Sequence, residues 1–345
     1  MTGTINDYAV IVNNVLKVIA PKTSPNIKSE YLDFMFKIGE AERIHSDTGV
    51  TGLGMGQIIP DGGIGMSDAP IQGFSKNYTQ LHFTTKVRLT FQSNFFLFES
   101  AVAKIKGTVK GKVIDGKNAI EHAKNYFGQT LLAQGFGTAF VWVPINTVGV
   151  PTPVSTLGAD GVEYWSQNHP REDGGPVWSN VVVDGTTPSP QFTYSALLAC
   201  RRIHSLKKDG RGMPLMSEVD TLVCRKGSQT AQFAKTIKST IDKGIAPQQT
   251  NLFNNAPATD TFKILELAPY QNLGITGLAW GMFDSSMINE DFGFLYIEAL
   301  GTRAEPAVVD ALGNQDLVMN FNSLAIMGAS DLRGWMWSAG DGTTT

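Results

Sequence analysis

One stretch of this chain alternates between apolar and polar side chains over ten residues, which limits what it can fold into. Its apolar members are Phe83, Val87, Leu89 and Phe91, and its polar members are His82, Thr84, Lys86, Arg88 and Thr90. Because successive side chains of a β-strand point to opposite faces, the pattern predicts a long strand with one covered face. The glycine-rich residues 56 to 63 are the expected antiparallel mate. An isolated hairpin is marginal in water, so this one should lie on its own domain or on a neighbouring surface.

A second stretch has the spacing of an amphipathic helix. The residues at this spacing are Ile120, Ala123, Phe127, Thr130, Leu131 and Gln134, and Gly135 and Gly137 follow them. Apolar residues three and four apart share one helix face, and glycine ends a helix. We therefore predict a helix over residues 117–134. It can extend back toward Val102, although Gly107, Gly111 and Gly116 would weaken or kink it.

The rest of the chain mixes shorter helices and strands. One helix is expected at 195–208, with Leu197, Cys200, Ile203 and Leu206 pointing inward, and another is expected from Ser228 onward. Strands are expected at 139–143, 221–224, 262–267, 294–297 and 317–326. Asp-Gly pairs at 160, 173 and 184 predict tight turns. In residues 1–50 Pro21 and Pro25 interrupt a short apolar patch, so we expect a mostly extended arm with at most one short helix. The mixture predicts an α+β fold.

The composition indicates a chain whose surface is partly buried against other chains. Of 345 residues, 17% are charged and 42% are apolar, whereas about 25% charged residues are typical of a soluble protein. The length is sufficient for two domains. Lys plus Arg number 28 and Asp plus Glu 31, so the net charge of -3 excludes a strongly basic protein that wraps nucleic acid. It does not exclude a protein that encloses DNA.

Motifs for catalysis, cofactors or metals are not evident in the sequence. The glycines from Gly52 to Gly56 lack the register of a phosphate-binding loop, and the five histidines are scattered. His169, Glu172 and Asp173 are residue types that ligate metals, but a solvated turn is the more economical interpretation. Cys200 and Cys224 are expected to be small core residues. We predict no catalytic, cofactor-binding or metal-ligating residues.

Two further features concern the surroundings of the chain. The lysines of a basic run could touch phosphates, although a solvated face is the simpler interpretation; they are Lys104, Lys106, Lys110, Lys112 and Lys117. No basic segment followed by an apolar run marks a secretory signal, and no stretch approaches the ~20 apolar residues of a membrane span. We therefore expect no membrane partner.

Several local patterns resemble those of one protein family. Residues 71–79 lie ahead of the alternating strand. In residues 160–170, Asp-Gly, aromatic residues, Ser and His-Pro precede a glycine-rich turn and Ser179-Asn180. The other patterns are 207–210, which end a helix, 222–224 and 331–335. Together with the order of the elements, they resemble the major capsid proteins of tailed bacteriophages, which share the Hong Kong 97-like fold. The pattern at 160–170 is the most specific of them.

The resemblance implies a division of the chain and a structural role. The implied parts are an N-terminal arm (1–50), an extended β-hairpin loop (51–92), a peripheral domain with a spine helix (93–145), an axial domain (146–305), and a return to the peripheral domain with a C-terminal tail (306–345). Copies would assemble through hexamers and pentamers into an icosahedral head that encloses phage DNA. The inter-subunit residues expected on the extended loop are Phe83, Lys86, Val87, Arg88, Leu89 and Phe91.

The resemblance also implies partners and leaves alternatives. A portal and a separate scaffolding protein are expected, because no long charged coiled coil precedes the first domain, and a decoration protein and non-specific contact with double-stranded DNA are further expectations. The location would be the virion, assembled in the host cytoplasm. We predict no isopeptide cross-linking. The alternatives are an encapsulin-like bacterial nanocompartment shell, a tail-tube protein, and a multidomain enzyme whose site lacks a recognisable motif.

Overall fold

A computed structural model describes most of the chain. The described residues are 5–39, 42–51, 68–90, 102–143, 151–243, 262–270, 276–289, 292–309 and 316–342. Helices and several separate sheets occur together, so the α+β expectation is confirmed. Within these residues, no helix is both long enough and apolar enough to cross a membrane.

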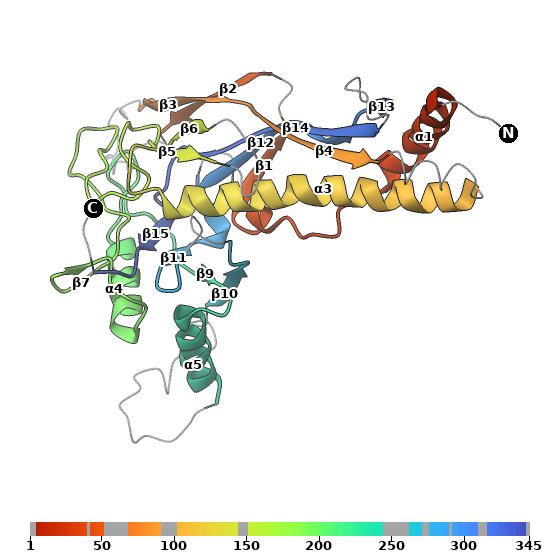
Figure 1. Ribbon diagram of the computed structural model, residues 1–345. Helices are drawn as coiled ribbons and strands as arrows, with labels where there is room; N and C mark the ends of the chain where they lie inside the picture. Colours follow the sequence, from red (N-terminus) through yellow and green to blue (C-terminus); the bar gives the residue numbers. More distant parts are fainter. Residues whose placement is uncertain are drawn as a thin grey trace, which may run out of the picture.

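The larger sheet runs the length of the molecule beside one long helix (Figure 1). Its strands follow the order β1 (Met35–Gly39), β12 (Phe294–Ala304), β14 (Leu317–Ala329) and β13 (Val308–Val309), and β4 (Leu81–Leu89) also pairs with β14. Only β1 pairs in parallel within this sheet, with Met35 opposite Phe294. The predicted strands at 294–297 and 317–326 are therefore present, and both are longer than expected.

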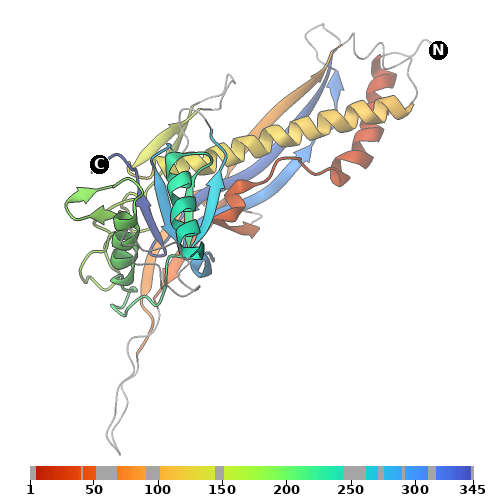
Figure 2. The ribbon, with the colours of Figure 1, turned by 90° about the horizontal axis from the view of Figure 1, so that it is seen from below.

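The long helix is α3 (Val102–Ala133), which confirms the helix predicted over 117–134 and its extension back to Val102. It buries an apolar stripe that includes Ile105, Val109, Val113 and Phe127. Figures 1 and 2 show one continuous helix, so the kink considered at its glycines is absent. A Cβ atom at Gly116 would lie 2.4 Å from the ring of Phe321, so this glycine allows α3 to approach β14 closely.

The N-terminal segment differs from the expected extended arm. Helix α1 (Ile5–Ile19) spans 15 residues and packs Val12, Val15 and Leu16 into the core. Short 3-10 helices follow at η1 (Ala20–Lys22) and η2 (Glu30–Asp33). Pro21 lies two residues beyond the last residue of α1; because a proline disfavours helix only in the turn that precedes it, it allows the earlier turns of α1 to form. The prediction of a mostly extended segment was wrong.

The hairpin in this structure is formed by other strands than the ones we predicted. Strand β2 (Ile44–Val50) pairs antiparallel with β3 (Gln72–Thr79), with Ile44 opposite Thr79. Strand β4, which we expected in the hairpin, instead pairs with β14 in the larger sheet. Its expected mate at 56–63 lies outside the described residues. The alternating pattern correctly predicted a strand with one covered face, but it carries no information about the partner strand.

A turn-rich part follows α3. Strand β5 (Ala139–Trp142) confirms the strand predicted there and pairs with β6 (Thr152–Ser155), and β7 (Val183–Asp184) pairs with β8 (Thr187–Pro188). The glycines of all three Asp-Gly pairs have positive φ angles, at Gly161, Gly174 and Gly185. This conformation is accessible to glycine at little cost, so these pairs form the turns that were predicted.

The second sheet has the order β10 (Lys263–Leu267), β9 (Thr221–Arg225), β11 (Trp280–Phe283) and β15 (Trp335–Ser338). Helices α4 (Tyr194–Ser205) and α5 (Gln229–Lys243) belong to the same part of the molecule, and η5 (Ser285–Met287) follows β11. Leu206, predicted to point inward, is 73% exposed because α4 ends one residue before it. Strand β15 closes the second sheet, and the assignment of residues 306–345 to the peripheral domain stays a prediction.

The second sheet lies between two apolar clusters. One face contributes Val223, Phe283 and Trp337 to the cluster that also contains α3 and the larger sheet. The other face contributes Leu222, Met282 and Met336 to a smaller cluster with α4 and α5. The rings of Trp165 and Trp337 stack with centroids 5.2 Å apart and join the turn-rich part to this sheet.

Candidate functional site

His169 belongs to a buried polar cluster and not to the solvated turn that was predicted. Its ring stacks on Trp178 at 4.2 Å, and its Nδ1 lies 2.6 Å from Asp160 Oδ2. The neighbouring Glu172 accepts a hydrogen bond from Arg333, and only 2% of His169 is exposed. The turn at Asp173-Gly174 is present, but the expected solvation of His169 was wrong, because Trp178 and Arg333 close over this segment. The bonds from His169 to Asp160 and from Arg333 to Glu172 hold the loop to the body.

The described residues offer little for chemistry. No three His, Cys, Asp or Glu side chains among them are arranged to hold a metal ion. Cys200 and Cys224 are both free and buried, as expected for core residues. Burial raises the pKa of each thiol to about 12, so neither forms a thiolate nucleophile near neutral pH.

Lys207 is one of the buried cations, and its contacts are structural. Burial lowers the pKa of its ammonium group to about 7. The group donates hydrogen bonds to the carbonyl oxygens of Arg333, at 2.9 Å, and Trp335, at 2.6 Å. Since these carbonyls lead into β15, Lys207 ties the end of α4 to the second sheet.

The hairpin of β2 and β3 is fixed to the body at a few polar points. The Lys76 ammonium donates to Leu157 O at 2.6 Å, Tyr164 Oη at 3.0 Å and Ala329 O at 3.2 Å, which uses its three N–H donors. The Arg211 guanidinium donates to Asp68 and to the carbonyl oxygen of Ala69, at the start of the return strand. These contacts hold β3 and the segment just before it against the body.

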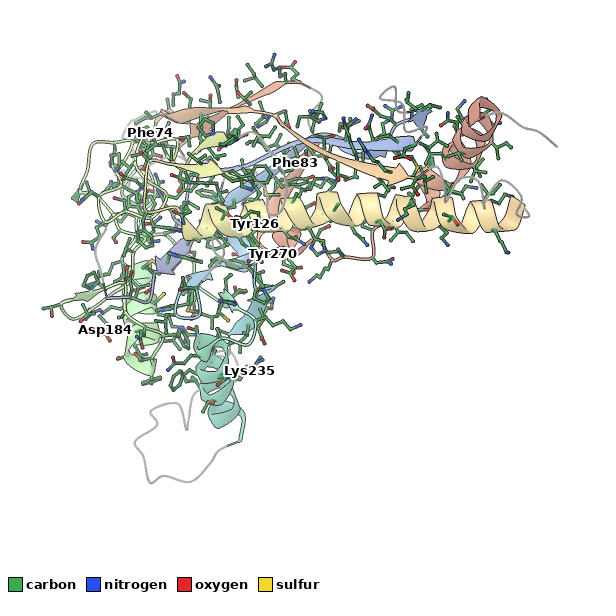
Figure 3. The ribbon with its side chains drawn as sticks, in the orientation of Figure 1. Phe74, Phe83, Tyr126, Asp184, Lys235 and Tyr270 are labelled. Atoms are coloured by element: carbon green, nitrogen blue, oxygen red, sulfur yellow. The ribbon has the colours of Figure 1, made fainter. Side chains whose placement is uncertain are left out.

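A cavity of about 390 Å³ lies where the hairpin meets the body. Thr51 and Phe74 line it from the hairpin, and His169, Asp209 and Arg333 line it from the other side. Figure 3 shows Phe74 at this end of the molecule. The hairpin is therefore not packed on the body along its full inner face, and the polar anchors described above set its direction.

The hairpin exposes apolar side chains. Ile44 is 49% exposed, Val50 69% and Ile71 41%. Between Ile44 and Val50 the exposed positions of β2 are Ser46, Thr48 and Gly49. Exposed apolar groups on a two-stranded hairpin gain free energy when another surface covers them.

The six residues predicted on the extended loop are divided by the structure. Phe83 and Leu89 are buried in the chain's own core, and Figure 3 shows Phe83 between the larger sheet and α3. The Phe83 and Phe127 rings meet edge to face at 5.9 Å. Val87 is partly buried against the same core. Burial in this core leaves Phe83 and Leu89 no surface for another subunit, whereas contact of the half-buried Val87 with another subunit stays a prediction.

The charged members of the predicted set have a different position. Lys86 and Arg88 lie on the opposite, exposed face of β4, where contact with another subunit stays a prediction. Phe91 lies outside the described residues. The hairpin residues Ile44 and Val50 were missed, since they fall in the segment assigned to the arm. The alternation of Ile44, Ser46, Thr48 and Val50 is the signal that could have found them.

A second exposed apolar surface lies at the other end of the molecule. Val10 and Val18 on α1 are 59% and 60% exposed, and Val308 on β13 is 60% exposed. Asn13 joins these elements through hydrogen bonds to the backbone of Ala307. Figure 1 shows α1 and β13 beside one end of α3, and β2 and β3 above the other end.

Comparison with known proteins gives a sequence result and a structural result. No protein-family model and no curated protein matches the chain. Similar solved structures include the capsid of a native GTA particle (TM-score 0.48, 9% identity, 92% of each chain covered) and the capsid of Myoviridae phage XM1 (0.45, 8%, 86% of this chain and 85% of that one). A virus-like particle from Pyrococcus furiosus has a TM-score of 0.40 at 7% identity, with 95% and 97% covered.

Proposed function

We propose that this chain is the major capsid protein of a tailed bacteriophage, which assembles through hexamers and pentamers into an icosahedral head around DNA. In this proposal α3 is the spine helix of the peripheral domain, the hairpin of β2 and β3 is the extended loop, and residues 146–305 form the axial domain. A portal, a separate scaffolding protein and a decoration protein are its partners, and the head is assembled in the host cytoplasm.

The observation that carries the proposal is the exposed apolar face of the anchored hairpin. A hairpin of two strands is marginal in water by itself, yet this one is held to the body by Lys76 within β3 and by Arg211, which binds Asp68 ahead of β3, and it exposes Ile44 and Val50. Covering a few hundred Å² of such surface stabilises a contact by several kcal/mol, at about 25 cal/mol per Å², before ordering costs. A neighbouring copy is the surface that supplies this cover.

The second apolar surface, on α1 and β13, makes the contact directional. Its residues differ from those of the hairpin, so a contact between the two surfaces joins unlike patches of two copies. Unlike patches give head-to-tail association, which closes into a ring when the rotation between copies allows it. Rings of six and five copies are the units from which a closed shell is built.

The test replaces the exposed apolar residues of the hairpin. We expect the purified unmodified chain to form closed shells or capsomer rings in negative-stain electron microscopy. The Ile44→Ser, Val50→Ser double variant should melt at nearly the same temperature, because both side chains are exposed, but should form no shells. Its matched control is the Val177→Ser, Met216→Ser variant, whose sites are 57% and 97% exposed and lie outside the hairpin.

Two outcomes would contradict the proposal. Normal shells from the hairpin double variant would remove the hairpin as the contact. A small uniform particle from the unmodified chain, with or without its neighbouring genes, would remove the shell function itself. The contents of a shell separate the phage head from the encapsulin-like alternative, since the first holds DNA and the second holds an enzyme.

A further inference from the structure

A groove of about 430 Å³ lies between α1 and the end of β12. Three cationic residues, Lys17, Lys117 and Arg303, line it together with the polar Asn13 and Thr302, and none of its lining residues is a carboxylate. Lys17 and Arg303 are exposed at its rim. A concave site with several cations and no acid favours an anionic ligand, because nothing within the groove neutralises its charge.

Lys117 forms the fixed inner part of the groove. Its ammonium donates to the carbonyl oxygens of Ala20, at 2.8 Å, and Thr23, at 2.6 Å, and only 9% of the residue is exposed. Burial lowers its pKa from the usual value. Two of its three N–H donors are used by these carbonyls, so the charge is held in place while the third donor remains for a ligand.

The cationic surface continues along α3. At about 100° per residue, Lys106 and Lys110 fall within roughly 40° of Lys117 on the helix circumference. Both are exposed, and so is Lys22 in η1. Figure 2 shows α1 crossing this end of α3. Of the nearby acids, Asp115 pairs with Lys112 at 3.6 Å and Glu305 is exposed on the segment that leads to β13.

We propose that this cationic surface, made of Lys17, Lys22, Lys106, Lys110, Lys117 and Arg303, binds backbone phosphates of the enclosed double-stranded DNA. The inference rests on the proposed function and names the part of the chain that faces the DNA. Exposed lysines one helical turn apart lie about 6 Å from each other along α3, and a duplex presents one phosphate charge per ~1.7 Å of its axis. A ridge of this kind contacts phosphates without reading the base sequence.

The test measures binding of a fluorescent 20-base-pair duplex by fluorescence anisotropy at several salt concentrations. It compares the full-length unassembled chain with the Lys17→Gln, Lys106→Gln, Arg303→Gln variant. Loss of three phosphate contacts should lower the slope of log K against log salt by about 2.7, and affinity at 0.1 M salt by roughly 100-fold. The control variant, Arg202→Gln, Lys208→Gln, Lys226→Gln, carries the same change in charge at exposed sites elsewhere and should bind DNA like the unmodified chain.

The outcomes separate this inference from the proposed function. Equal salt slopes for the two triple variants would overturn the inference, even if both form shells. Stronger binding of polyglutamate than of the duplex, lost in the first variant, would also overturn it and would identify an acidic protein segment as the occupant. Binding of inorganic phosphate without any binding of the duplex would also overturn the inference and would leave the groove a simple anion site. Failure of every variant and of the unmodified chain to form shells would instead contradict the proposed function.

Discussion

Strands β14 and β15 are close in sequence but differ in how they are covered. From Leu317 to Leu324 alternate residues of β14 are buried and the others are half-exposed, whereas all four residues of β15 are buried. The reason is that α3 covers one face of the larger sheet, while both faces of the second sheet contribute to apolar clusters. The second sheet is therefore complete within one chain, and the outer half of the larger sheet keeps one face available to other copies.

The largest loss of stability is expected when a charge is placed on the covered face of the larger sheet. Leu89 is 2% exposed, so Leu89→Asp should lower the free energy of unfolding by about 4 kcal/mol or more, because the carboxylate has no partner there. Urea denaturation followed by circular dichroism measures the loss. The control is Lys86→Asp on the exposed face of the same strand, which should change stability little; equal losses would mean that both faces are covered.

Shortening a buried side chain of the second sheet tests whether the chain itself covers both faces of this sheet. Met282 is fully buried on β11, so Met282→Ala should cost about 3 kcal/mol from lost apolar burial and the cavity left behind. In the proposed shell the expected loss is the same before and after assembly, because the chain itself buries this site completely. A much smaller loss, below about 1 kcal/mol, would show that the region between the clusters is loosely packed.

The pH dependence of stability tests how well His204, on α4 in the same part of the molecule, is buried. Burial lowers the pKa of His204 to about 3, and its Nε2 lies 2.7 Å from Ser217 Oγ. The unfolded chain takes up a proton near pH 6.5 while the folded chain stays neutral, so stability is lost as the pH falls from 6.5 toward 3. We expect a loss of about 2 kcal/mol between pH 6.5 and 5, which His204→Gln removes. An unchanged acid slope in that variant would mean that His204 is hydrated.

The smallest effect is expected on the open face of β14. Val318 is half-exposed there, opposite Arg88 of β4, so Val318→Ala should cost less than about 1 kcal/mol in the isolated chain. If another copy covers this face in the shell, the same variant should show a larger loss after assembly, seen as a lower melting temperature of shells. Equal losses in both states would leave this face exposed in the shell.

The sequence predicted the elements whose signal is local. Met319 and Phe321 alternate with Asn320 and Asn322, and this predicted β14 directly, since the covered face depends only on the strand's own period. The stripe through Ile120 and Phe127 predicted α3 in the same way. In both cases the side chains that define the element are adjacent in sequence or one helical turn apart.

What the sequence did not predict has a non-local cause. The pairing of β4 with β14, the place of β15 in the second sheet and the burial of His169 each depend on residues far away in the chain, such as Phe321, Phe283 and Arg333. A pattern of alternation states which face is covered but not what covers it. For the same reason the sequence did not show that Phe83 and Leu89 are buried, whereas Ile44 and Val50 are exposed.

The parallel pairing of β1 with β12 has a consequence for biosynthesis. Met35 and Phe294 are partners, so the larger sheet cannot close until nearly the whole chain has left the ribosome. At about 5 to 20 residues per second, the apolar face of β1 waits roughly 10 to 50 s for its mate. Contacts of such high sequence separation also form slowly. Every copy therefore passes through an interval in which an unpaired strand edge is exposed to aggregation, and a host chaperone that shields this edge would raise the yield of folded chains.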